Sequence, residues 1–204
     1  MEILITGIII YIEMQLFIRC SFRLAQHYDA EYELNITSRV SIGITLGCGA
    51  AVIGIMTCLP HFSRIEKLGC GILAAYLITA VIMDVQTLKI YDFLHPAAAG
   101  VGMLLLLHKN TEAEAYISLL LYGLIQYAIF TRMYGKADGK AFFTCAVYQS
   151  LYHHGLFTYL LHMAAVFLLL AIVQIKKKNL NRKGSLKQPV PLLPYIAACA
   201  VLFL

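Results

Sequence analysis

Long apolar segments separated by short charged clusters are the feature of this sequence that most restricts its fold. Residues 68–83 and 156–175, for example, contain no Asp, Glu, Lys or Arg. A helix of about 20 apolar residues crosses the hydrocarbon core of a bilayer, and shorter helices are tolerated inside a protein or in a thinned bilayer. The charged residues do not follow the helical spacing of an amphipathic soluble helix. The pattern therefore predicts membrane-spanning helices.

The overall composition supports the same interpretation. Of 204 residues, 60% are apolar and 13% are charged, whereas soluble domains are roughly half apolar and a quarter charged. The six cysteines form no C-x-x-C pair and mostly lie in apolar segments. They indicate small buried side chains rather than a zinc site or a disulfide framework.

Eight segments are expected to span the membrane, which makes the fold class an all-α polytopic transmembrane helical bundle. The count is six if the short sixth and eighth segments do not cross. The first segment is expected to be retained as a helix, because no basic flank precedes it and no small-residue cleavage site follows it. The segments are residues 3–18, 40–59, 68–83, 93–107, 115–131, 141–152, 156–175 and 190–204.

The lysines and arginines predict the orientation of these spans. Eight crossings place alternate loops on opposite sides, and thirteen basic residues fall on one side against three on the other. The positive-inside rule assigns the richer side to the cytoplasm of a cell membrane, with both termini outside. The net charge of +5 then reflects topology and contacts with the lipid bilayer, and no nucleic acid is expected. The richer set is Arg19, Arg23, Arg39, Lys89, Arg132, Lys136, Lys140, Lys176, Lys177, Lys178, Arg182, Lys183 and Lys187; the other is Arg64, Lys67 and Lys109.

Two aspartates at the ends of predicted spans are the strongest candidates for chemistry. Asp84 directly follows the third span and Asp138 precedes the sixth, so the topology places both on the cytoplasmic side. Two carboxyls about 3 Å apart share a proton, and one can activate water as a base while the other polarises a carbonyl as an acid. Gly135 and Gly139 would let the backbone bend and a substrate strand approach. Spacing alone leaves open a helix cap and a solvated helix end.

Three segments of the chain resemble motifs of the type IV prepilin peptidases. Residues 84–92, DVQTLKIYD, are similar to the first aspartate motif, and residues 135–140, GKADGK, to the Gly-x-Gly-Asp motif that is followed by Lys. Residues 187–194, KQPVPLLP, are similar to the basic, proline-containing approach to the last helix. The three matches occur in family order within residues 68–204, about two-thirds of the chain.

The resemblance implies an aspartic endopeptidase with Asp84 and Asp138 as its catalytic pair. Gly135, Gly139 and Lys140 would support the second motif, and neither a metal nor an organic cofactor would be required. The implied substrates are prepilin-like single-span membrane proteins of a type IV pilus or secretion system, whose basic leader is cut at the cytoplasmic membrane face. The expected organisation is an N-terminal transmembrane region, residues 1–67, followed by a peptidase-like domain, residues 68–204.

The chain also departs from the family pattern. Ala137 replaces the second glycine of Gly-x-Gly-Asp, and Tyr91-Asp92 stands where Pro-Asn is usual. Asp92 is expected to cap the fourth helix rather than to act in catalysis. The paired-cysteine domain with which bifunctional members methylate their product has no counterpart in the short loop of residues 19–39, so cleavage without N-methylation is expected.

Other functions remain as alternatives. Asp84 and Asp138 could carry protons or cations in a membrane transporter, or the chain could be an inactive scaffold of a pilus or secretion complex. His153-His154 is interpreted as a solvated turn rather than a metal site. Glu13, inside the first span, is either paired within the bundle or close to the membrane surface.

Overall fold

A computed structural model describes residues 2–28, 37–87, 90–109, 111–180 and 191–203, and all regular structure in these residues is helical. This confirms the predicted all-α class for the described part of the chain.

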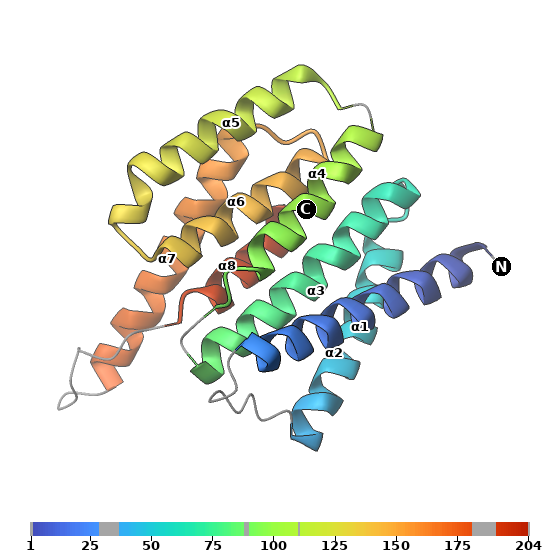
Figure 1. Ribbon diagram of the computed structural model, residues 1–204. Helices are drawn as coiled ribbons and strands as arrows, with labels where there is room; N and C mark the ends of the chain where they lie inside the picture. The colour runs from blue at the N-terminus through green and yellow to red at the C-terminus, as the bar shows by residue number, and fades with distance from the viewer. Residues whose placement is uncertain (1, 29–36, 88–89, 110, 181–190, 204) are drawn as a thin grey trace. The chain divides into compact units, whose positions relative to one another are not determined.

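The chain divides into two compact units, Met1–Thr111 and Glu112–Leu204. The first contains α1 (Glu2–Tyr28), α2 (Ser38–Cys58), α3 (Arg64–Thr87) and α4 (Leu94–His108); the second contains α5 (Ala113–Ala128), η1 (Phe130–Arg132), α6 (Lys136–Ser150), α7 (Leu156–Leu180), α8 (Leu193–Ala200) and η2 (Val201–Phe203) (Figure 1).

Four of these helices are long and apolar enough to cross a membrane. They comprise Ile3–Tyr28, Val40–Cys58, Arg64–Thr87 and Leu156–Lys176, while Leu94–His108 and Leu193–Phe203 are apolar but shorter. The full count of eight spans therefore remains a prediction. The expected division after Lys67 falls inside α3 and also remains a prediction.

The first helix is longer than its apolar segment. Helix α1 continues to Tyr28, ten residues beyond the predicted end, so Arg19 and Arg23 lie on the helix instead of in a loop. The buried stripe of α1 explains the extension, because Phe22 and Ala25 continue it past the last apolar run. Charged side chains end an apolar segment, but they leave the backbone hydrogen bonds of the helix intact.

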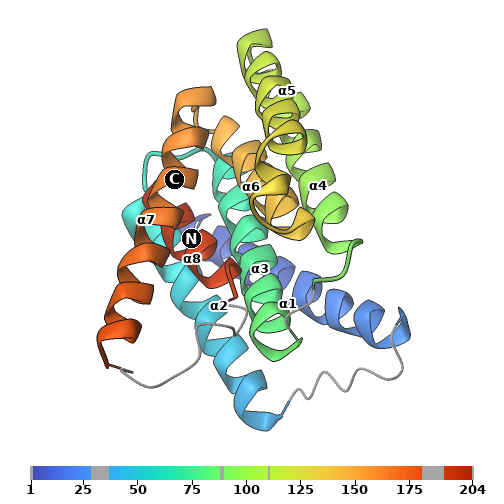
Figure 2. The same cartoon turned by 90° about the vertical axis from the view of Figure 1, so that its left-hand side faces the viewer.

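Helix α3 forms the core of the first unit, where it packs against α1, α2 and α4 (Figure 2). Ile10, Met14 and Ile18 recur every four residues on α1 and are buried, as one face of a helix requires. Gly71 on α3 lies opposite them, and a Cβ at this glycine would be only 2.6 Å from Cγ2 of Ile10. The close approach of α1 and α3 therefore depends on glycine.

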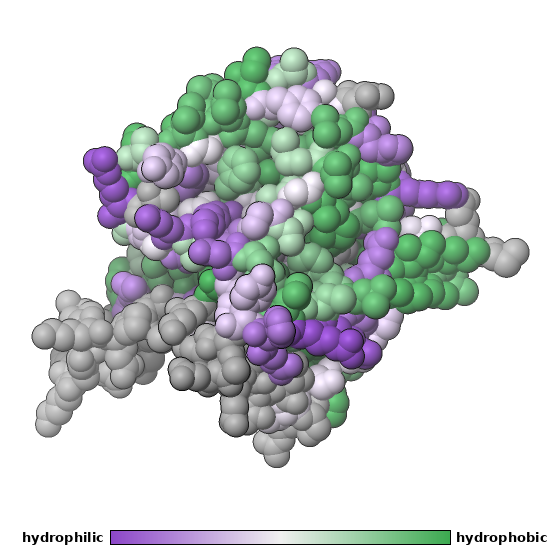
Figure 3. Space-filling view, in the orientation of Figure 1, coloured by the Kyte–Doolittle hydropathy of each residue, from purple (hydrophilic) through white to green (hydrophobic). Residues whose placement is uncertain are grey.

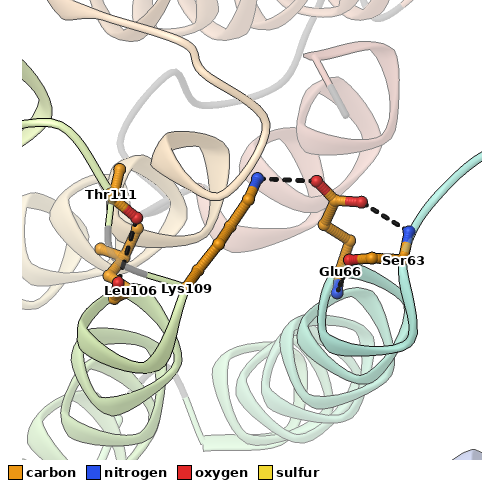
Figure 4. Close-up of polar contacts among 5 residues, drawn as sticks. All are labelled: Ser63, Glu66, Leu106, Lys109 and Thr111. Atoms are coloured by element: carbon orange, nitrogen blue, oxygen red, sulfur yellow. Dashed lines mark hydrogen bonds and ion pairs between the residues drawn. The ribbon is translucent and has the colours of Figure 1, made fainter.

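A capping box begins α3. The Ser63 amide donates to Oε2 of Glu66 (2.6 Å), and the Glu66 amide donates to Oγ of Ser63 (3.3 Å). The other carboxylate oxygen, Oε1 of Glu66, accepts a hydrogen bond from Nζ of Lys109 at 2.7 Å, and Thr111 closes the end of α4 by donating to the Leu106 carbonyl (Figure 4). These contacts satisfy exposed helix-end groups and join the start of α3 to the end of α4.

Helix α6 forms the core of the second unit and packs against α5, α7 and α8. Ten of its fifteen residues are buried. It begins at Lys136, five residues before the predicted span, because the polar first turn belongs to the helix although it is not apolar. Asp138 consequently lies inside α6 rather than ahead of it.

The outer surface of the first unit is unusually apolar. The N-terminal half of α1 exposes a series of large aliphatic side chains, and Figure 3 shows hydrophobic surface along it. A soluble monomer rarely exposes so continuous an apolar surface. The exposed residues are Ile3, Leu4, Ile5, Ile8, Ile9 and Ile12.

Candidate functional site

Asp84 occupies an unfavourable place for an ordinary acidic side chain. It lies in the last turn of α3, three residues before the helix ends at Thr87, and is only 7% exposed. The helix macrodipole disfavours a negative charge near a C-terminus, and burial disfavours a charge anywhere. Neither a helix cap nor a solvated helix end accounts for this position of the aspartate.

A buried tyrosine on the same helix, two turns before Asp84, pairs with a buried histidine on α4. Oη of Tyr76 is 2.8 Å from Nδ1 of His95, and His95, in the first turn of α4, is 2% exposed. The two rings also meet edge to face at 5.9 Å. Sequence analysis missed this pair, although a histidine within an apolar segment is the signal that could have revealed it.

Asp138 has a favourable place, in contrast to Asp84. It is the third residue of α6 and is partly exposed. Negative charge in the first turn of a helix is stabilised by the macrodipole. The position alone therefore explains an acidic residue here, so the case for chemistry depends on the surroundings of the carboxylate.

Gly135 leaves room for that carboxylate. The glycine is the N-cap of α6 with φ −64° and ψ 149°, a conformation open to any residue, so the backbone angles here do not themselves require glycine. A Cβ at Gly135, however, would lie 3.2 Å from Oδ2 of Asp138. Close approach thus accounts for this glycine, while Gly139 and Ala137 both have helical backbone in the first two turns of α6.

Tyr134 fixes the chain just before the glycine. Its hydroxyl donates to Oε1 of Gln126 on α5, and its ring lies 5.6 Å from Phe142 and 5.5 Å from Phe167. Burial raises the pKa of Tyr134 above its ordinary value, and the negative charge of Asp138 raises it further. The tyrosine therefore stays neutral beside the aspartate, and sequence analysis had assigned it no role.

The remaining motif residues are only partly described. Lys140 is exposed on α6, while Leu88, Lys89 and residues 187–190 lie outside the described residues. Pro194 is the second residue of α8, a position where proline is favoured. This agrees with the predicted proline-containing start of the last helix.

Asp92 does not cap α4, contrary to the prediction. The N-cap is Phe93, which makes no side-chain capping hydrogen bond, and the Leu94 amide instead donates to the Tyr91 carbonyl. The helix begins one residue later than a cap at Asp92 would require. Asp92 is exposed on the link before α4.

The structure places the two candidate aspartates in different units. Asp84 belongs to Met1–Thr111 and Asp138 to Glu112–Leu204, and each has been described within its own unit. Their pairing as a dyad stays a prediction. The geometry adds that the carboxylate of Asp84 is buried near the C-terminus of a helix, and that the carboxylate of Asp138 lies close to a glycine.

The other sequence candidates have simpler settings. His153 and His154 lie in the turn between α6 and α7, as predicted, with His153 exposed and at φ 61°. Oε2 of Glu13 is buried and has no hydrogen-bond partner among the described residues, so the paired alternative for Glu13 gains no support. Within the same part of the chain, no three His, Cys, Asp or Glu side chains are grouped to hold a metal ion.

No family model, curated protein or solved structure matches the chain. The function must therefore be argued from the motifs and the local geometry.

Proposed function

We propose that this protein is a membrane-embedded aspartic endopeptidase that uses Asp84 and Asp138 to cleave the leader of prepilin-like proteins. The observation that carries the proposal is the burial of Asp84 in the last turn of α3. A carboxyl there costs stability through both the helix dipole and desolvation. Such a cost is typical of a residue retained for chemistry.

The membrane setting is supported by the four long apolar helices and by the exposed aliphatic surface of α1. We propose about eight spans, with the short helices crossing where other helices or a thinned bilayer cover them. The basic residues orient the two aspartates toward the cytoplasm of the cell membrane. Cleavage then takes place at the cytoplasmic membrane face.

The helix ends at which Asp84 and Asp138 lie suit the two aspartates to different catalytic roles. The N-terminus of α6 favours the charged form at Asp138, which acts as the base, while the C-terminus of α3 favours the neutral form at Asp84, which acts as the acid. Asp138 takes a proton from water as the water oxygen attacks the scissile carbonyl carbon. Asp84 gives its proton to the carbonyl oxygen. Collapse of the tetrahedral intermediate breaks the C–N bond: the amine leaves with the proton from Asp138, and one hydroxyl of the intermediate returns its proton to Asp84 as the carbonyl forms again.

The substrate follows from the resemblance to the prepilin peptidases. It is a single-span protein with a basic leader ahead of a hydrophobic helix, and its scissile bond lies near the membrane surface. The product keeps an unmodified amine, because no part of the chain resembles the family's methyltransferase domain. The mechanism requires no metal.

Leader cleavage in cells tests the proposal. Prepilin-like proteins from the same genome are co-expressed with wild type, Asp84→Asn or Asp138→Asn, and products are followed by gel shift and N-terminal sequencing. Asparagine keeps the size of aspartate but cannot transfer the proton, so both variants are expected to leave the leader uncut. Asp92→Asn is the matched control, because Asp92 is exposed and belongs to the same motif.

Cleavage by a fully expressed Asp84→Asn or Asp138→Asn protein would contradict the aspartic mechanism. If Asp92→Asn also failed to cleave, any change in the first motif would abolish activity. The loss of cleavage in Asp84→Asn would then not identify Asp84 as catalytic, and that assignment would fail. Absence of cleavage by wild type would favour a transporter or an inactive scaffold.

A further inference from the structure

Neutral polar side chains are concentrated in the interior of the second unit. They come from α5, α6 and α7, and each is at most 3% exposed. An apolar bundle accepts such groups only when their hydrogen bonds are satisfied. The residues are Tyr122, Gln126, Gln149, Ser150, Tyr159 and His162.

His162 determines how the amide of Gln149 is oriented. Nε2 of His162 lies 3.3 Å from the carbonyl oxygen of Ile196, and a carbonyl can only accept, so Nε2 carries the hydrogen. Nδ1 of this neutral ring must then accept, and it does so from Nε2 of Gln149 at 3.3 Å. The amide nitrogen of Gln149 is therefore engaged, and its oxygen, Oε1, faces elsewhere.

The neighbouring polar groups are already in use. Oη of Tyr159 donates to the His154 carbonyl at 2.7 Å and lies 2.6 Å from Oγ of Ser150. Gln126 accepts from Tyr134 and donates to Sδ of Met163 at 3.5 Å. These contacts engage the polar side chains of Ser150, Tyr159 and Gln126.

Among the described residues of the second unit, two fully buried side-chain atoms have no hydrogen-bond partner in the protein: Oη of Tyr122 and Oε1 of Gln149. Tyr122 is 0% exposed and Gln149 is 1% exposed. The side chain of Gln126, one turn along α5, lies close to the Tyr122 hydroxyl, but its amide is already engaged by Tyr134 and Met163. Each unsatisfied group costs roughly 1–3 kcal/mol.

We propose that the second unit binds internal water at Oη of Tyr122 and Oε1 of Gln149. The tyrosine hydroxyl donates to a water oxygen, and a water O–H donates to the glutamine carbonyl oxygen. Buried water commonly satisfies polar groups that the protein leaves unpaired. The inference stands independently of peptidase activity, because it depends only on residues within α5–α8.

X-ray radiolytic footprinting of the whole protein in detergent tests for this water. Radiation converts bound water to hydroxyl radicals where it lies, so Tyr122 is expected to be oxidised although bulk solvent cannot reach it. Tyr76 is the matched control, because it is also 0% exposed but its hydroxyl contacts His95. Oxidation of Tyr122 severalfold above that of Tyr76 supports the proposal, and equal oxidation of the two overturns it.

Thermal unfolding of Tyr122→Phe supplies a second test. The phenyl ring preserves the packing against Tyr159, whose ring lies 5.3 Å from that of Tyr122, and removes only the hydroxyl. If the hydroxyl holds water, the variant has a lower Tm than wild type, whereas Tyr116→Phe, at a partly exposed position on the same helix, does not. An unchanged or higher Tm for Tyr122→Phe overturns the proposal, because deleting an unsatisfied buried hydroxyl is neutral or stabilising.

Discussion

Gly135 and Asp138 provide the sharpest test at the scale of single residues. Alanine fits the backbone at Gly135, but its Cβ would lie 3.2 Å from Oδ2 of Asp138. The carboxylate must then move by a few tenths of an ångström or more. Because catalysis depends steeply on placement, we expect Gly135→Ala to lower the leader-cleavage rate roughly 10- to 100-fold, measured with purified protein, while Tm stays near that of wild type.

Gly100→Ala on α4 is the control for this prediction, since a Cβ there meets nothing within 4 Å. It should cleave at the wild-type rate. A Gly135→Ala protein that cleaves as fast as wild type would show that the space beside Asp138 has no catalytic purpose.

His154 gives the turn between α6 and α7 a pH dependence. Burial, and then the neighbouring His153, lower the pKa of His154 below its ordinary value. The unfolded chain therefore binds a proton at a higher pH than the folded chain, and the stabilising effect of the neutral ring is lost as pH falls from about 6.5 through the lowered pKa. We expect Tm to fall over this window, and to fall less for His154→Gln.

The two proteins should have similar pH dependence above pH 8, where the imidazole is neutral in both states. Identical Tm curves for wild type and His154→Gln between pH 8 and pH 5 would argue against this account.

Residue types and positions predicted only part of the candidate site. The sequence indicated both aspartates, but it could not distinguish the buried Asp84 from Asp138 in a favourable first turn, because burial depends on tertiary packing. It also missed Gln126, Gln149 and His162, because neutral polar side chains carry no charge that sets them apart within an apolar segment. Neutral polar residues within apolar segments are a signal that sequence reasoning can use.

At the scale of helices, the contact between α1 and α3 should be sensitive to side-chain size at Gly71. The Cβ of alanine would lie 2.6 Å from Cγ2 of Ile10, so the two helices must separate or Ile10 must change rotamer. We expect Gly71→Ala to destabilise the protein by about 1–3 kcal/mol. Unfolding can be followed with a thiol-reactive dye, since Cys48 and Cys70 are buried in the native state.

Gly54→Ala on α2 is the matched substitution. A Cβ there meets nothing within 4 Å, and alanine is the better helix former by about 1 kcal/mol, so this variant should be as stable as wild type or more so. Equal stability of the Gly71→Ala and Gly54→Ala proteins would show that α1 and α3 do not pack through Gly71.

Hydropathy predicted where helices occur better than where they end. Each of the eight predicted segments overlaps one α-helix, but α1 runs on to Tyr28 and α6 begins at Lys136. In both cases polar residues continue the helix beyond the apolar segment. Apolar length reports how much of a helix can lie in a bilayer, whereas helix ends depend on capping and packing.

At the scale of the whole molecule, the orientation in the membrane is the main prediction still to be tested. Single cysteines can be placed at His61, on the link between α2 and α3, and at Lys136, at the start of α6, because both positions are exposed. The background should lack Cys20 and Cys58, which are also exposed. In intact cells, a membrane-impermeant maleimide is expected to label His61→Cys, while Lys136→Cys is labelled only after permeabilisation.

The reverse labelling pattern would invert the topology and place Asp138 outside the cytoplasm. Labelling of both positions in intact cells would put them on one side and would rule out the alternating eight-span arrangement.

The most direct test of the central claim is cleavage by the purified protein in liposomes. The substrate is a synthetic single-span protein with a basic leader, and mass spectrometry identifies the new N-terminus. Wild type should make one cut between the leader and the hydrophobic helix, while Asp84→Asn and Asp138→Asn should each be slower by roughly 100-fold or more. Cleavage at the wild-type rate by either variant would contradict the assignment of Asp84 and Asp138 as a catalytic pair.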